Sequence, residues 1–78
     1  MIIKRWNVQK ELPSRLLKYT IDITNHSYED GHSVTVTAEG CPLLRATDIT
    51  RQEAEGHAQS FITSLASEGF TITPGETP

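Results

Sequence analysis

The apolar residues of this 78-residue chain follow helical spacing in one segment and strand spacing in most of the rest. Between residues 51 and 68 they recur every three to four positions, which predicts one amphipathic helix. Its apolar stripe consists of Ala54, Ala58, Phe61, Ile62, Leu65 and Ala66. Thr50 and Glu53 have the spacing of a capping box, and Gly69 lies where a left-handed residue ends a helix. The sequence therefore predicts where this helix begins and ends and which side is buried.

The remaining apolar residues alternate with polar ones, as in strands with one buried face. The pattern covers residues 1–8, 17–23, 33–39, 43–47 and 70–73. Asp30-Gly31 is a favoured pair for a tight hairpin turn, and a turn there would place Ile23 opposite Ala38. Together these segments predict an α+β fold. We expect one antiparallel sheet of about four to five short strands, with the helix packed on one face.

The size of the chain limits what it can enclose. With 36% hydrophobic residues, the chain is near the lower limit for a self-sufficient core. We expect a single domain over residues 1–74 and a flexible C-terminal tail over residues 75–78. A metabolite pocket would hollow out so small a core, so we expect no cofactor and no enzymatic activity. A homodimer would be a natural way to add buried area.

The reactive side chains carry no recognisable motif. Cys41 is the only cysteine, which excludes an intramolecular disulfide and favours a cytoplasmic protein, in the host cytoplasm if it is phage-encoded. A buried or an inert role for Cys41 is simpler than a thiol nucleophile. The three histidines, His26, His32 and His57, lack the spacing of zinc ligands, so no metal site is expected. No apolar run reaches the roughly 18 residues of a membrane helix, so no membrane contact is expected.

The net charge of −3 is unevenly distributed. Residues 1–18 hold five of the seven basic residues and one acid, whereas the remainder holds nine acids. The N-terminal residues Lys4, Arg5, Trp6 and Lys10 combine cations with an aromatic that can stack on a base. Nucleic-acid binding, or contact with an acidic partner, through this segment is therefore an alternative function. Because polyanion binding usually goes with net positive charge, direct nucleic-acid binding is not the expected main role.

The candidate partner-binding residues lie in the predicted hairpin tip and at the start of the helix. Tyr28 is the best anchor, because an aromatic in a turn has little core to join, although it can also pack against the sheet edge. Glu29 and Asp30 lie beside it, and Glu53 and Glu55 can present carboxylates to a basic surface. The outward sheet face would carry Thr20, Thr24, Thr35, Thr37, Thr71 and Thr73. Threonine suits strands sterically, but such a face is also a weakly charged platform for a partner.

Three motifs occur in order between residues 19 and 62. They are the acidic turn Glu29-Asp30-Gly31 after a strand, the segment Cys41-Pro42-Leu43-Leu44, and a helix opening with Thr50-Arg51-Gln52-Glu53-Ala54. This order partially resembles the ribonuclease-H-like domain of HicB-type antitoxins, although the Pro-x-Leu-Pro-Gly core of that family's middle segment is missing. The resemblance implies a protein that binds and neutralises a toxin without catalysis. As a class, a tiny acidic chain without catalytic motifs is also similar to small phage-encoded inhibitors such as anti-CRISPR proteins.

Size, charge and missing catalytic motifs together predict a protein-binding module. We expect it to inhibit a larger protein or nucleoprotein complex by occupying the surface with which that partner works. An interface of about 800 Å² per partner fits on one face of so small a domain.

Overall fold

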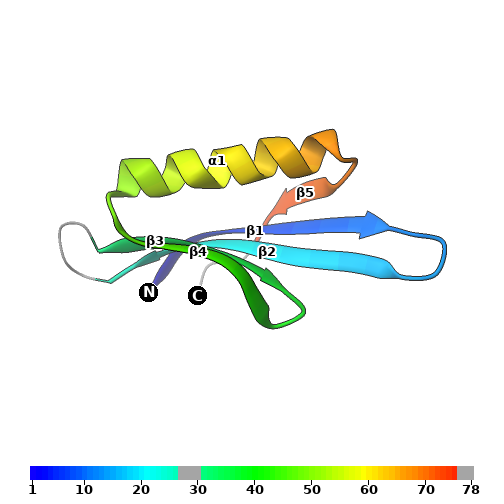
Figure 1. Cartoon of the computed structure of the whole chain (residues 1–78), viewed down its shortest axis with the longest axis horizontal. Helices are drawn as coiled ribbons and strands as arrows, with labels where there is room; N and C mark the ends of the chain where they lie inside the picture. Colours follow the sequence, from blue (N-terminus) through cyan, green and yellow to red (C-terminus); the bar gives the residue numbers. More distant parts are fainter. Residues whose placement is uncertain (27–30, 76–78) are drawn as a thin grey trace.

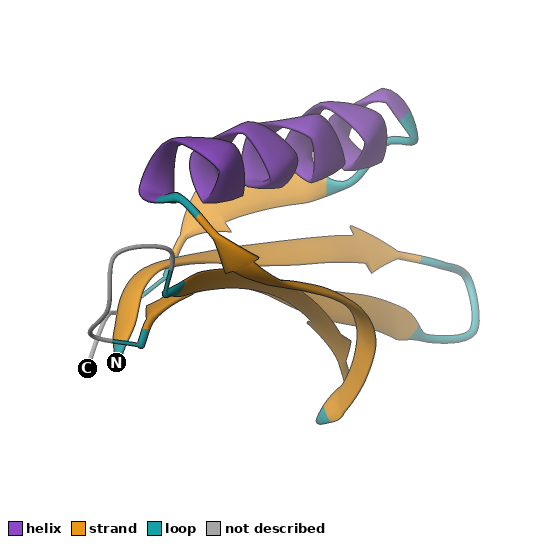
Figure 2. Ribbon diagram, turned by 60° about the vertical axis from the view of Figure 1, so that its left-hand side comes forward, coloured by secondary structure: helices purple, strands orange, loops and turns teal. Residues whose placement is uncertain are grey.

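The computed structural model describes residues 1–26 and 31–75. The strands are β1 (Ile2–Glu11), β2 (Leu16–Asn25), β3 (His32–Ala38), β4 (Cys41–Ile49) and β5 (Thr71–Pro74), and the helix α1 (Arg51–Ser67) lies between β4 and β5. The strands form an antiparallel sheet in the order β4-β3-β2-β1-β5. Helix α1 crosses one face of this sheet (Figures 1 and 2). For the described residues, the predicted α+β fold with one sheet and one helix is confirmed.

The core lies between α1 and the sheet. Its buried apolar residues are Val8, Ile21, Ile23, Val34 and Val36 from the strands and Ala54 and Ala58 from the helix. Small alanines let α1 approach the sheet closely, and burial of each large aliphatic side chain stabilises the fold by about 1.5–3 kcal/mol. The rings of Tyr19 and Phe70 lie 5.5 Å apart at the end where α1 finishes. The seven buried residues make this a small core, as the composition predicted.

Both ends of α1 have the local motifs that the sequence predicted. The Thr50 hydroxyl accepts the Glu53 N–H at 3.2 Å, and the Glu53 carboxylate accepts the Thr50 N–H at 3.2 Å. At the other end, Gly69 has φ +91° and donates its N–H to the carbonyl of Ala66 at 3.1 Å. The N–H of Phe70 reaches the carbonyl of Leu65 at 3.1 Å, which completes a Schellman motif. The predicted end at residue 68 is one residue late.

Strand β1 is longer than predicted. The prediction stopped it at residue 8, whereas every residue from Lys4 to Glu11 pairs with β2. Polar residues fill the end of the strand, so apolar periodicity gave no signal there, and backbone pairing extends it. The turn falls at residues 12–15, where the N–H of Leu12 donates to the carbonyl of Arg15 at 2.8 Å.

The predicted register between β2 and β3 is wrong by four positions. Ile23 pairs with Val34, and Ala38 pairs with Tyr19. The N–H of His26 donates to the carbonyl of Gly31, so Gly31 does not lie in the centre of the expected two-residue turn. A shift by an even number of residues keeps every side chain on its own face, and the predicted buried face of both strands is therefore correct.

Strand β4 is also longer than predicted, because the break after β3 is a two-residue turn. Glu39 and Gly40 both have positive φ, at 50° and 83°, as in the mirror-image turns that match strand twist. Cys41 and Pro42 therefore belong to β4, and Cys41 is exposed rather than buried. Proline is tolerated in β4 because β4 lies at the sheet edge.

At the opposite edge of the sheet, the hydrogen bonding to β1 extends one residue beyond β5. Gly75, which the sequence assigned to a flexible tail, donates its N–H to the carbonyl of Arg5 at 2.8 Å. The contact with β1 therefore continues one residue past Pro74. Residues 76–78, the rest of the predicted tail, lie outside the described part of the chain.

Candidate binding surfaces

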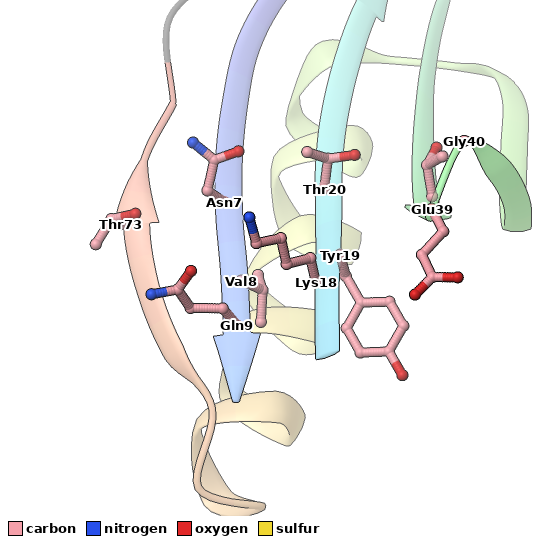
Figure 3. Close-up of a pocket in the computed structure, with 10 residues that line it drawn as sticks. Asn7, Val8, Gln9, Lys18, Tyr19, Thr20, Glu39, Gly40 and Thr73 are labelled. Atoms are coloured by element: carbon pink, nitrogen blue, oxygen red, sulfur yellow. The ribbon is translucent and has the colours of Figure 1, made fainter. Parts of the chain in front are cut away.

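The sheet face opposite α1 carries polar side chains from neighbouring strands. Strand pairing aligns four of them in one row across the sheet, in the order Thr73, Asn7, Thr20 and Thr37. Asn7, Thr20 and Gln9 project from this side of the sheet, with α1 behind it (Figure 3). No described element covers this side (Figure 2). We call it the polar face. It confirms the predicted threonine-rich outer surface.

A shallow groove of about 500 Å³ crosses the polar face. Besides the row of four, its polar lining includes Gln9, Lys18 and Glu39. Hydroxyl and amide groups can both donate and accept hydrogen bonds, and the two charged side chains have opposite signs. The groove can therefore bind polar groups of a partner without favouring either sign of charge.

Arg5 and Asp22 form a bidentate ion pair on the polar face, beside the row of four polar side chains. The Arg5 Nε donates to Asp22 Oδ1 at 2.6 Å and an Nη donates to Oδ2 at 3.2 Å. The hydrogen bond and the negative charge of Asp22 raise the pKa of the Arg5 guanidinium above its ordinary value. Both charges are thus satisfied within the chain, and this part of the face has no net charge.

The N-terminal residues proposed for nucleic-acid contact are divided between the two faces of the sheet. Consecutive strand residues alternate, so Lys4, Trp6 and Lys10 lie on the helix side while Arg5 lies on the polar face. The Lys4 ammonium is 3.7 Å from the carboxylate of Glu55 and 5.6 Å from the centroid of the Trp6 ring. Trp6 itself packs against the core. The structure therefore does not join these residues into one basic patch.

Lys10 contacts the C-terminal end of α1. Its ammonium donates to the carbonyl of Glu68 at 2.8 Å and lies 5.5 Å from the centroid of the Phe70 ring. The last turn of α1 has no basic residue of its own. The helix dipole favours a cation at this end of α1, so the contact of Lys10 stabilises the helix.

The two helix acids proposed for partner binding also have partners within the chain. Glu53 closes the capping box, and Glu55 lies 3.5 Å from the Arg51 guanidinium as well as near Lys4. Both remain near the surface, but their charges are partly compensated. The hairpin-tip candidates Tyr28, Glu29 and Asp30 lie outside the described residues.

A second surface, which sequence reasoning missed, lies between β4 and the end of α1. Leu43 and Leu44 are 57% and 54% exposed and border a groove of about 260 Å³. The other apolar residues that line this groove are Tyr19, Val36, Phe61, Leu65 and Phe70. We call the two leucines and this groove the apolar edge. The sequence signal for this surface was the adjacent pair of leucines, which interrupts the alternation of apolar and polar residues expected in a strand.

The histidines and Cys41 do not come together in the described residues. His26 Nε2 lies 3.1 Å from the Ser33 hydroxyl, but Ser33 is only 1% exposed, so that hydroxyl is inaccessible to a substrate. His57 is exposed on α1, and the Nδ1 atom of His32 is buried without a hydrogen-bond partner among these residues. Within residues 1–26 and 31–75, no group of three His, Cys, Asp or Glu side chains could hold a metal ion.

No family model, curated protein or solved structure matches this chain. The partial resemblances to HicB-type antitoxins and to anti-CRISPR proteins therefore stay predictions. In the part of the chain that the structure describes, no helix has the length and apolarity needed to cross a membrane.

Proposed function

We propose that this chain is a small non-enzymatic binding module that inhibits a larger protein or nucleoprotein complex by covering its working surface. The observation that carries the proposal is the polar face, where a row of hydroxyl and amide side chains crosses four strands. The groove along that row is open to an approaching surface. The contact would be made by side chains on a rigid sheet.

The charges on the polar face favour a protein surface as its partner. The Arg5 Nε atom forms an ion pair with Asp22 Oδ1 at 2.6 Å. Lys18 and Glu39, which carry opposite charges, both line the groove of the polar face. Interfaces between proteins combine hydrogen bonds with an apolar fraction like that of ordinary surface, and their centres are depleted of charge. The uncharged centre of the polar face has this character.

Nucleic acid is the less favoured partner. Binding to phosphates needs several cations on one surface, because their combined field releases counterions. Lys4 and Lys10 lie on the helix side with partners of their own, whereas Arg5 lies on the polar face. A phosphate backbone following one face would meet few unmatched cations.

Steric occlusion is a sufficient mechanism for a molecule of this shape. The chain measures 44 × 22 × 19 Å, so an interface of about 800 Å² on its broad side would cover a comparable area of the partner. Two partner classes follow from the sequence resemblances. They are a bacterial toxin, as for an antitoxin, and a nucleoprotein complex of bacterial defence, as for an anti-CRISPR protein.

A matched pair of threonine substitutions tests the binding face. Thr37→Arg places a long cation in the row on the polar face, and Thr63→Arg places the same side chain on the exposed side of α1. We expect the unchanged chain and Thr63→Arg to capture the same protein from bacterial lysate. With that protein purified, Thr37→Arg should weaken binding by roughly tenfold or more, because a charge would be buried without a partner.

Two results would contradict the proposal. Equal affinity of Thr37→Arg and the unchanged chain would exclude the polar face as the interface. Loss of binding only in Thr63→Arg would place the contact on α1. Circular dichroism of both variants must show an unchanged fold before the affinities are compared.

A further inference from the structure

The two edges of the sheet differ in how well they are protected. Edge strand β5 is only four residues long, so it offers little backbone to a further strand. Edge strand β4 is nine residues long and has only β3 as a neighbour among the described strands. No other described strand pairs with its outer side. Pro42 has no N–H to donate, but beyond it such an edge can accept another strand.

A bulge in β4 gives that edge an apolar character. Val36 pairs with Leu44 and the next residue, Thr37, pairs with Pro42, so Leu43 is the extra residue. Bulges redirect side chains that would otherwise alternate. As a result Leu43 and Leu44 both line the groove of the apolar edge. More than half of each side chain is nevertheless exposed.

The exposed area of the chain also exceeds that of a compact monomer. It exposes 5186 Å², whereas a compact protein of 8.7 kDa exposes about 4,700 Å². The excess, about 10%, is a little over half of the roughly 800 Å² that each partner contributes to a standard interface. Pairing through β4 would cover the two exposed leucines and the groove together.

We propose that β4 pairs with β4 of a second copy, antiparallel, and joins the two sheets into one. A twofold axis perpendicular to the sheet relates the copies, so the β4 edges of both copies are paired at once and only the short β5 edges stay outermost. The leucines of each copy then lie beside the groove of the other. Strand β4 contains one cation, Arg45, and one anion, Asp48, so self-pairing adds no net charge.

This arrangement goes beyond the proposed function and is independent of it. An axis perpendicular to the sheet leaves both helices on one side and both polar faces on the other. The dimer would therefore present one continuous polar face of twice the width. A heterologous strand would satisfy only one edge and would leave its own outer edge open.

The mass in solution tests the proposal. Sedimentation equilibrium of the unchanged chain should give twice the monomer mass of 8.7 kDa. Leu44→Lys should raise the dissociation constant roughly tenfold or more, because it places two like charges at the paired edge. Leu16→Lys is the matched control, since Leu16 is 38% exposed on β2, away from the apolar edge. That variant should remain a dimer.

Cross-linking tests the geometry without relying on a destabilising variant. In the Cys41→Ser background, single cysteines are introduced by Leu44→Cys, Arg45→Cys and Ala46→Cys. Opposed residues of an antiparallel pair lie about 4.5–5.5 Å apart at Cα, within the reach of a disulfide. The position nearest the axis should therefore form a dimer on mild oxidation. Gln59→Cys, on the exposed side of α1, should not.

Three outcomes would overturn the proposal. The first is a monomer at every concentration, and the second is a Leu44→Lys variant that dimerises like the unchanged chain. In the third, the chain is monomeric, and partner capture is lost in Leu44→Lys but kept in Thr37→Arg. That result would show that the apolar edge binds a different protein and not a second copy. Loss of capture in Thr37→Arg alone would bear only on the polar face, so the two proposals can fail separately.

Discussion

Gly75 and Gly56 differ in what a methyl group would meet at each position, so the same substitution should have opposite effects. A Cβ at Gly75 would lie 2.6 Å from Cγ of Arg5, near the backbone end of that side chain. Gly75→Ala should therefore displace Arg5 and lower the free energy of unfolding by about 1 kcal/mol or more. A Cβ at Gly56 would have no neighbouring atom within 4 Å. Gly56→Ala should raise the free energy of unfolding by about 1 kcal/mol, because alanine is the better helix former.

Thermal unfolding measures both effects. For a domain of this size, about 1 kcal/mol shifts the melting temperature by roughly 4–8 °C. An unchanged melting temperature in Gly75→Ala would mean that Arg5 moves away at no cost. In that case the hydrogen bond from Gly75 to the carbonyl of Arg5 would not fix the position of the Arg5 side chain.

The residues whose roles were predictable from the sequence are those that act locally. Thr50 and Glu53 are three positions apart, and the left-handed Gly69 directly follows the helix, so short-range geometry determines their contacts. The ion pair of Arg5 with Asp22 joins residues 17 positions apart. No rule based on local spacing finds such a pair, because it depends on the register of β1 against β2.

At the level of elements, the same contrast separates the helix from the strands. Helix α1 begins at the predicted residue and ends one residue early, because its own sequence contains both caps. The β2–β3 register was wrong because loop length, and not apolar alternation, determines which residues pair. The bulge at Leu43 was missed because it depends on the pairing of β4 with β3. The buried face of the sheet was thus predictable, whereas the apolar edge was not.

The capping box should contribute measurably to the stability of α1. Thr50→Ala removes the hydroxyl that accepts the Glu53 N–H at 3.2 Å and leaves that donor without its partner in the helix. We expect the free energy of unfolding in urea to fall by about 1 kcal/mol. Thr63→Ala is the control, because it makes the same change at an exposed position inside the helix and should stabilise slightly. Equal effects of the two substitutions would show that the cap contributes nothing.

At the scale of the whole molecule, one helix covers a sheet whose two sides and two edges differ. Apolar and polar residues alternate along the strands, so the side of the sheet that faces away from α1 is polar. The apolar edge lies where β4, most of whose residues are exposed, borders the C-terminal half of α1. The short β5 and the open β4 make the two ends of the sheet unequal. Under the two proposals above, the polar face binds a partner and the β4 edge binds a second copy.

If the second copy binds at β4, folding and association are linked, and the melting temperature must depend on protein concentration. A ligand that binds only the folded state stabilises it by mass action, and here that ligand is the chain itself. Raising the concentration a hundredfold adds about 2.7 kcal/mol for each dimer, which should raise the melting temperature by roughly 5–10 °C. Leu44→Lys should show a smaller dependence on concentration because its dimer is weaker, whereas Leu16→Lys should retain the full dependence. A melting temperature of the unchanged chain that is independent of concentration would exclude a coupled dimer. In that case the chain would fold as a monomer with the apolar edge open.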